Sequence, residues 1–97
     1  MKFRDFLVEK QEVTINQRDK EYDGVPSIAI EARDGSFPTI TYDNDTYYIF
    51  DAASEGPTSG EESNDFDKAF KILKNTYGVT VSSKDSAKFS DAVMVAQ

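Results

Sequence analysis

Residues 37–50, FPTITYDNDTYYIF, contain two short runs that are rich in threonine, tyrosine, isoleucine and phenylalanine. The first run is Phe37 to Tyr42, and the second is Thr46 to Phe50. Residues of these types favour β-strands, and the polar triplet Asp43-Asn44-Asp45 between the runs is typical of a tight turn. The stretch therefore predicts a β-hairpin, which we expect to lie at the centre of the fold.

Two more strands are predicted upstream of this hairpin. Apolar and polar residues alternate around residues 13–16 and again around residues 27–32, which is the period of a half-buried strand. Residues 17–24 between them are charged and turn-prone. Asp34-Gly35 precedes the central hairpin, and this dipeptide favours tight hairpin turns because glycine adopts positive φ easily. We therefore predict an antiparallel meander over residues 26–50.

The second half of the chain contains the clearest helical pattern. Residues 51–64 hold two glycines, one proline and four acids without an apolar period, which predicts a long, mobile acidic loop. Residues 65–77 then predict an amphipathic helix, capped by Ser63 or Asn64 and ended by Gly78. The apolar residues of this helix recur at helical spacing: Phe66, Ala69, Phe70, Leu73 and Tyr77.

The two ends of the chain are predicted to add smaller elements. Val79 and Val81 indicate a fifth strand, residues 82–88 a turn or short helix, and residues 92–96 a last strand. At the start, an apolar stripe of Phe3, Phe6 and Leu7 indicates a short helix over residues 2–10. The predicted fold class is α+β: a single domain over residues 1–97 with an antiparallel sheet of four to five strands and the helix 65–77 packed across one face.

Composition narrows the function classes. A length of 97 residues fits one domain, and 38% hydrophobic residues suffice for one core. The sequence has no cysteine and no histidine, which excludes disulfides, thiolate zinc sites, thiol nucleophiles and the usual general base. It has no apolar run of the length that spans a membrane. We expect a soluble, non-enzymatic protein without a cofactor.

The net charge of −7 is concentrated in the middle of the chain. Residues 11–65 hold thirteen acids against Arg18, Lys20 and Arg33, whereas residues 66–97 hold five lysines against three aspartates. An acidic region repels nucleic acid and membranes and attracts basic protein surfaces. The expected partner is therefore a basic protein surface, with no direct nucleic-acid or membrane contact, and the oligomeric state stays open.

The predicted partner-binding residues are acids of this region together with one tyrosine beside them. Tyrosine suits protein interfaces because its rigid ring gives a large contact area at low entropic cost. The candidates are Asp19, Glu21, Asp23, Asp43, Asp45, Tyr47, Asp51, Glu55, Glu61 and Glu62. Lysines 68, 71 and 74 of the predicted helix are interpreted as a solvated face, with a docking surface for an acidic partner as the alternative.

Asp43-Asn44-Asp45 is also the best candidate for a cation site. A calcium loop of the EF-hand type needs glycine at its sixth position, and here that position holds Tyr48. A polar hairpin turn is therefore the favoured interpretation, and no metal ligand is assigned. Carboxylate pairs of the glycosidase kind are expected by chance among so many acids, and they predict no activity.

The first nine residues, Met1-Lys2-Phe3-Arg4-Asp5-Phe6-Leu7-Val8-Glu9, resemble the capsid-targeting leaders of internal head proteins of large contractile-tailed phages. In that family a prohead protease cuts after a Leu/Ile-x-Glu triplet, which Leu7-Val8-Glu9 matches. The resemblance implies that residues 1–9 direct the protein into the head and that Glu9 precedes the cut. It also implies a protein of the virion interior that enters the host cytoplasm with the DNA, where some such proteins inhibit defence enzymes. The alternative is an ordinary first helix that packs on the sheet.

Three functional hypotheses follow. The first is a phage or mobile-element accessory protein that inhibits a host nucleic-acid-binding or defence protein through its acidic face. The second is a packaged internal virion protein without inhibitory activity. The third is a small ligand-binding or calcium-binding domain with its site at the turn 43–45.

Overall fold

The structure is a computed structural model that describes residues 12–32 and 34–96. The predicted helix at residues 2–10 and the predicted cleavage site at Glu9 lie outside the described residues. The elements in chain order are β1 (Glu12–Asp19), the 3-10 helix η1 (Lys20–Tyr22), β2 (Val25–Glu31), β3 (Pro38–Asp43), β4 (Thr46–Asp51), β5 (Glu61–Ser63), α2 (Phe66–Tyr77) and α3 (Ser83–Ala96). The predicted α+β class, with a helix packed on an antiparallel sheet, is confirmed.

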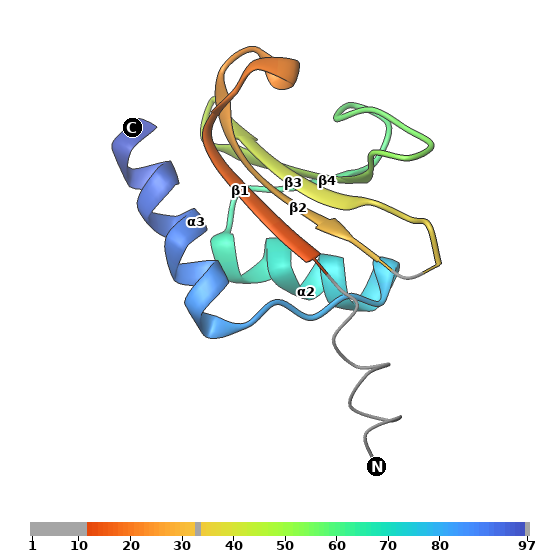
Figure 1. Ribbon diagram of the computed structural model, residues 1–97. Helices are drawn as coiled ribbons and strands as arrows, with labels where there is room; N and C mark the ends of the chain where they lie inside the picture. The colour runs from red at the N-terminus through yellow and green to blue at the C-terminus, as the bar shows by residue number, and fades with distance from the viewer. Residues whose placement is uncertain (1–11, 33, 97) are drawn as a thin grey trace.

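The five strands form one antiparallel sheet in the order β1-β2-β3-β4-β5, so that each strand pairs with its neighbour in the chain (Figure 1). The predicted central hairpin is β3–β4, in which Ile40 pairs with Ile49 and Thr41 pairs with Tyr48. Its turn places Asn44 and Asp45 at φ of 51° and 62°. Two consecutive positive φ values match the twist of the flanking strands, and Asn and Asp tolerate them better than most residues do.

Helices α2 and α3 cover one face of the sheet, which we call the inner face (Figure 1). α3 packs against β1 and β2, whereas α2 packs against β3, β4 and β5. Alternate strand residues point into this layer, and the aromatic ring of the fully buried Phe89 lies among those of Tyr47, Phe66 and Phe70. The buried residues of the sheet that belong to this core are Ile28, Ile30, Ile40, Tyr42, Tyr47 and Ile49.

Helix α2 begins and ends on local signals, and one of them differs from the prediction. The side chain of Asp65 caps the helix by accepting a hydrogen bond from the Lys68 amide at 3.1 Å. The predicted caps were Ser63 and Asn64. Ser63 instead accepts a hydrogen bond from the Asp65 amide at 3.1 Å, which holds the capping residue in place. The C-terminal end agrees with the prediction, since Gly78 lies at φ 70° and its amide donates to the last turn of the helix.

Two segments predicted as connections contain strand. β1 continues through Gln17 and Arg18 to Asp19, and a register shift interrupts its pairing with β2 between Asn16 and Asp19. The predicted loop 51–64 contains the strand β5, which pairs with β4. The end of β1 and the whole of β5 were missed because their residues are polar or charged and lie at the sheet edges, where alternation is weak. The mobility predicted for the loop stays a prediction.

The two strands predicted near the C-terminus were wrong. Residues 79–81 form no strand, although Val79 is buried in the core. Residues 83–88 belong to the helix α3, which agrees with the short-helix alternative predicted for 82–88, whereas the strand predicted at 92–96 is the end of the same helix. The Ser82 side chain accepts from the Asp85 amide at its start, and its buried residues Phe89, Ala92 and Val93 follow helical spacing. Neither helix of the described chain is long and apolar enough to cross a membrane.

Candidate binding site on the outer face of the sheet

The face of the sheet opposite the two helices, which we call the outer face, has a polar row across its middle. The strand registers align one residue from each strand in this row: Asn16, Ser27, Thr41, Tyr48 and Glu62. Side chains of a strand alternate between the two faces, so the buried Ile28, Ile40 and Ile49 belong to the opposite face. The row therefore gives the sheet a polar centre on the side that the helices leave uncovered.

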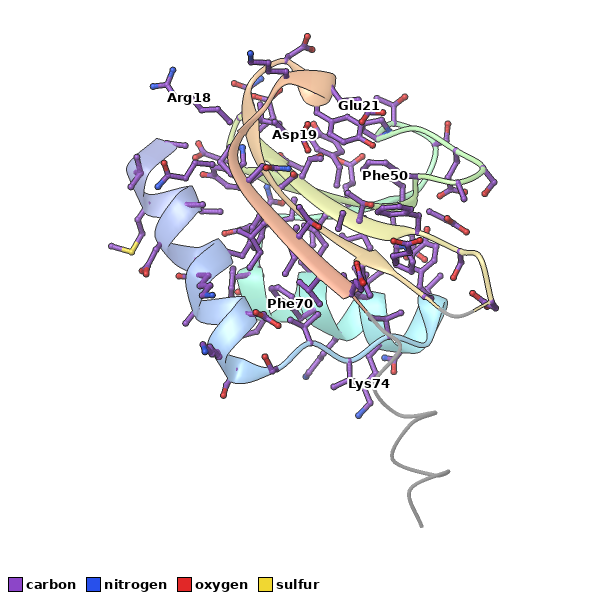
Figure 2. The ribbon with its side chains drawn as sticks, viewed as in Figure 1. Arg18, Asp19, Glu21, Phe50, Phe70 and Lys74 are labelled. Atoms are coloured by element: carbon purple, nitrogen blue, oxygen red, sulfur yellow. The ribbon has the colours of Figure 1, made fainter. Side chains whose placement is uncertain are left out.

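Two connections rise above this face (Figures 1 and 2). The first contains η1, and the ring of Tyr22 in it meets the ring of Phe50 edge-on, with centroids 5.6 Å apart. Phe50 points to the outer face yet is fully buried. The side chain of Asp19 holds the first connection by accepting from the Glu21 amide at 3.1 Å and from the Ser27 hydroxyl at 2.7 Å.

The second connection, residues 52–60, is tied to the sheet by carboxylates. Asp51 accepts hydrogen bonds from the amides of Phe37 at 2.8 Å and Ala53 at 3.0 Å. Glu55 accepts from the hydroxyl of Tyr77 at 3.0 Å, which links the connection to the end of α2. Asp51 and Glu55 thus hold this segment beside the outer face.

Between the two connections the outer face forms an open depression of about 530 Å³, which we call the outer pocket. Thr41 and Tyr48 belong to the sheet, and Tyr22 to the first connection. Four carboxylates line it, Glu21, Asp23, Asp43 and Glu55, whereas none of the described lining residues is lysine or arginine. The complete lining is Glu21, Tyr22, Asp23, Val25, Thr41, Asp43, Tyr48, Ala52, Glu55, Gly56, Pro57 and Thr58.

Local electrostatics favour positive charge in the outer pocket. Burial raises the pKa of the Tyr22 phenol, and the nearby carboxylates of Glu21 and Asp19 raise this pKa further. The Tyr22 ring therefore stays neutral at physiological pH and presents a π-face to a cation.

Comparison of the chain with protein-family models, with curated proteins and with solved structures gives no match.

The structure brings together four of the ten predicted partner-binding residues in this pocket, Glu21, Asp23, Asp43 and Glu55. Asp19 and Asp51 hold the two connections, as described above, and both are partly buried. Asp45 accepts a hydrogen bond from the Tyr42 hydroxyl at 2.9 Å, and Glu61 accepts one from Thr76 at 3.0 Å. Glu62 belongs to the polar row of the outer face but is not among the residues that line the outer pocket.

Tyr47 was wrongly assigned to the binding face. It is only 7% exposed and packs on the inner face against Phe66 and Phe89. The partly exposed tyrosine is its neighbour Tyr48. Strand alternation would have separated them, because Tyr47 shares a face with Ile49 and Tyr48 does not. The same parity assigns Thr41 to the outer face, whereas no sequence signal places Tyr22 beside it.

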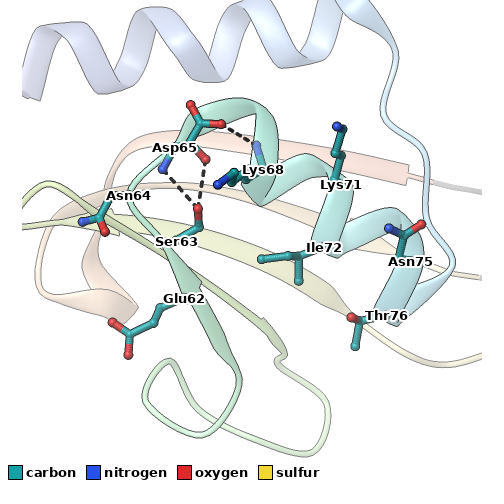
Figure 3. A pocket seen from close by; sticks show the side chains of 9 residues that line it. All are labelled: Glu62, Ser63, Asn64, Asp65, Lys68, Lys71, Ile72, Asn75 and Thr76. Carbon is teal, nitrogen blue, oxygen red and sulfur yellow. Dashed lines mark hydrogen bonds between the residues drawn. The ribbon is translucent and has the colours of Figure 1, made fainter.

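Two other depressions have a different character. One of about 560 Å³ lies between β5 and α2, and its lining mixes Glu62 and Asp65 with Lys68 and Lys71 (Figure 3). The hydrogen bonds drawn there belong to the capping of α2 by Asp65 and Ser63. A smaller one of about 260 Å³ lies beside Phe66 and Phe70. Both linings contain acidic as well as basic side chains, so neither depression has the uniformly acidic lining of the outer pocket.

The turn 43–45 is a hairpin turn in which the Asp45 carboxylate accepts from Tyr42. Within residues 12–32 and 34–96, no group of three or more histidines, cysteines or carboxylates has the arrangement of a metal site.

Proposed function

We propose that the protein is a non-enzymatic, acidic protein-binding domain that docks on a basic protein surface through the outer pocket. The observation that supports this proposal is the composition of the pocket. Four carboxylates and two tyrosines line it, and its described lining residues include no basic side chain. Aromatic and polar side chains around a recess are typical of protein interfaces, and the charge selects a basic partner.

The distribution of charge between the sheet and the helices also supports docking through the outer face. Residues 12–65, which form the sheet and its connections, hold thirteen acids and three bases, a net charge of −10. Residues 66–97, which include both helices, have a net charge of +2. Such a field steers the acidic side of the molecule toward a basic surface and accelerates association.

The proposed partner is a host nucleic-acid-binding or defence protein that the domain inhibits. Proteins that bind nucleic acids present basic grooves to the phosphates, and an acidic protein competes for the same groove. The origin of the protein in a phage or mobile element rests on the resemblance of residues 1–9 to capsid-targeting leaders.

A pull-down from host lysate tests the proposal, with the protein immobilised and the captured proteins identified by mass spectrometry. We expect basic nucleic-acid-binding proteins to be retained at low salt and released at high salt, because salt screens contacts between exposed charges. The double variant Asp23→Asn/Asp43→Asn should retain less. The control Asp67→Asn/Asp91→Asn removes the same charge from the helix layer and should retain as much as the unchanged protein.

Two outcomes would contradict the proposal. One is that no basic protein is retained at low salt. The other is that both double variants lose retention equally, since the effect would then come from net charge rather than from the outer pocket.

The second candidate function is that of a packaged internal virion protein without inhibitory activity, which the triplet Leu7-Val8-Glu9 favours. It predicts that the protein isolated from particles begins at Lys10. Intact-mass measurement distinguishes this product from the full chain. Full-length protein within particles would exclude processing at Glu9.

A further inference from the structure

One buried hydroxyl group in the outer pocket has no partner in the protein. Thr41 is only 2% exposed, and its side chain has no hydrogen-bond partner among the described residues. The other small hydroxyl residues buried on the same face are satisfied internally. Thr39 donates to the Phe37 carbonyl at 2.8 Å, and Ser27 donates to Asp19 at 2.7 Å. Thr41 is therefore the exception on this face.

The direction of the Thr41 hydroxyl follows from the same facts. No described side-chain nitrogen or oxygen is both sealed from solvent and without a hydrogen-bond partner. The Thr41 oxygen therefore reaches open space, and the open space beside Thr41 is the outer pocket that it lines. A nearly buried hydroxyl without a protein partner costs free energy unless water or a ligand supplies the hydrogen bond.

The side chains around Thr41 define what fits there. Tyr48, its cross-strand neighbour, is half-buried, and its hydroxyl likewise has no partner in the described chain. Tyr22 provides a second ring, and Glu21, Asp23 and Asp43 are exposed at the pocket. The pocket thus combines aromatic faces with hydrogen-bond acceptors and a negative potential.

We propose that the outer pocket receives a single arginine side chain of the basic partner, an inference that rests on the proposed function. A guanidinium group has five N–H donors and no acceptor, which matches a lining of carboxylates and hydroxyls. It also stacks on aromatic rings and is more weakly hydrated than the ammonium group of lysine. A volume of about 530 Å³ accommodates one such side chain together with water.

Nuclear magnetic resonance of the uniformly 15N-labelled full chain tests this inference with three small probes: N-acetyl-argininamide, N-acetyl-lysinamide and N-acetyl-citrullinamide. Citrulline has nearly the shape of arginine without its charge. We expect argininamide to shift the backbone amides of Tyr22, Thr41, Tyr48 and residues 56 and 58. Lysinamide should bind more weakly, and citrullinamide should leave these amides unchanged at the same concentration.

Variants test the contribution of individual groups. Thr41→Val keeps the shape of the side chain and removes its hydroxyl, so argininamide binding should weaken by about tenfold, the usual effect of one hydrogen bond to a charged group. Asp43→Asn should weaken it comparably and gives a second test if Thr41→Val lowers stability. Asp91→Asn, in the helix layer, should bind as the unchanged protein does.

Three results would each overturn the inference. They are equal shifts with the arginine and citrulline probes, equal affinity for the arginine and lysine probes, and shifts spread over acidic residues outside the pocket. The result is separable from the proposed function. If basic proteins are captured from lysate while argininamide and Thr41→Val have no effect, the arginine pocket is wrong and the acidic binding domain stands. If argininamide binds in the pocket and no protein is captured, the arginine pocket stands and the proposed docking on a basic protein is wrong.

Discussion

Gly60 marks the closest approach of the second connection to the sheet. A Cβ atom at this position would collide with the carbonyl oxygen of Ile49 and would lie 2.8 Å from the Cβ of Phe50. Both neighbours belong to the strand β4, which is paired on both sides, and have little freedom to move. The absence of a side chain at residue 60 therefore allows this connection to lie beside the outer face.

We expect Gly60→Ala to lower the free energy of unfolding by about 1–3 kcal/mol, the usual cost of forcing an extra methyl group into a packed site. The matched control is Gly56→Ala in the same connection, where a Cβ meets no atom within 4 Å. Urea denaturation of both variants makes the comparison. Equal stability of the two variants would show that the close approach at residue 60 is relieved by movement of the connection.

Tyr77 joins α2 to the same connection. Its hydroxyl donates to Glu55 at 3.0 Å. Burial raises the pKa of the Tyr77 phenol to about 12, and the hydrogen bond to Glu55 and the nearby carboxylates contribute to the rise. Between the ordinary pKa of 10.0 and about 12, the unfolded chain releases this proton while the folded protein retains it. The stability contributed by Tyr77 is therefore complete below pH 10 and is lost as the pH rises through 12.

Tyr77→Phe removes this titration. We expect the variant to be less stable near neutral pH by about 0.5–1.5 kcal/mol, because one hydrogen bond is lost. Its stability should also fall less steeply than that of the unchanged protein between pH 10 and 12. Thermal unfolding over this pH range provides the measurement, and parallel pH profiles for the two proteins would contradict the assignment.

Among the elements, those with strong local patterns were predicted, whereas the edge strand β5 and the full length of α3 were not. The hairpin β3–β4 was predicted because β-favouring residues flank a short polar turn. Helix α2 was predicted because its apolar residues recur at helical spacing. Residues 92–96, Ala-Val-Met-Val-Ala, form a short apolar run with two valines, which resembles a strand. They are helical because Phe89, Ala92 and Val93 are buried in the core, a tertiary contact that the run itself does not encode.

The cap of α2 provides a test at this scale. We expect Asp65→Ala to destabilise the protein by about 0.5–2 kcal/mol, because the Lys68 amide loses its acceptor. Asp65→Asn is the matched control and should change stability little, since asparagine caps helices about as well as aspartate. Denaturant unfolding of the three proteins distinguishes these effects. Equal losses for both variants would indicate that the charge of Asp65, rather than its hydrogen bond, stabilises α2.

At the scale of the whole molecule, the outer pocket shows the limit of prediction from the sequence. The acidity of residues 11–65 was recognised, yet the pocket is assembled from the first connection, the hairpin β3–β4 and the second connection. Glu21 and Glu55 line the same pocket only because the meander brings both connections over the same face. Strand parity assigns Thr41 and Tyr48 to that face, whereas the positions of the connections follow from tertiary packing such as the contact of Tyr22 with Phe50.

The packing of α3 predicts the effect of removing it. A chain that ends at residue 82 lacks Phe89, Ala92 and Val93, all buried, and leaves the inner side of β1 and β2 uncovered. We expect this chain to lose cooperative thermal unfolding and to bind a hydrophobic dye. The control replaces Met94 and Val95, which are 67% and 69% exposed, by serine and should unfold as the unchanged protein does. Cooperative unfolding of the shortened chain would show that α3 is dispensable.

The contact between α3 and β1 joins the last described element to the first. During synthesis the strands of the meander leave the ribosome in the order in which they pair. Each strand can therefore pair with the preceding strand soon after it emerges. The inner side of β1 and β2, however, stays bare until the final helix has emerged. Folding of this domain is therefore expected to finish only after residues 83–96 have left the ribosome, and until then the nascent chain presents an apolar surface.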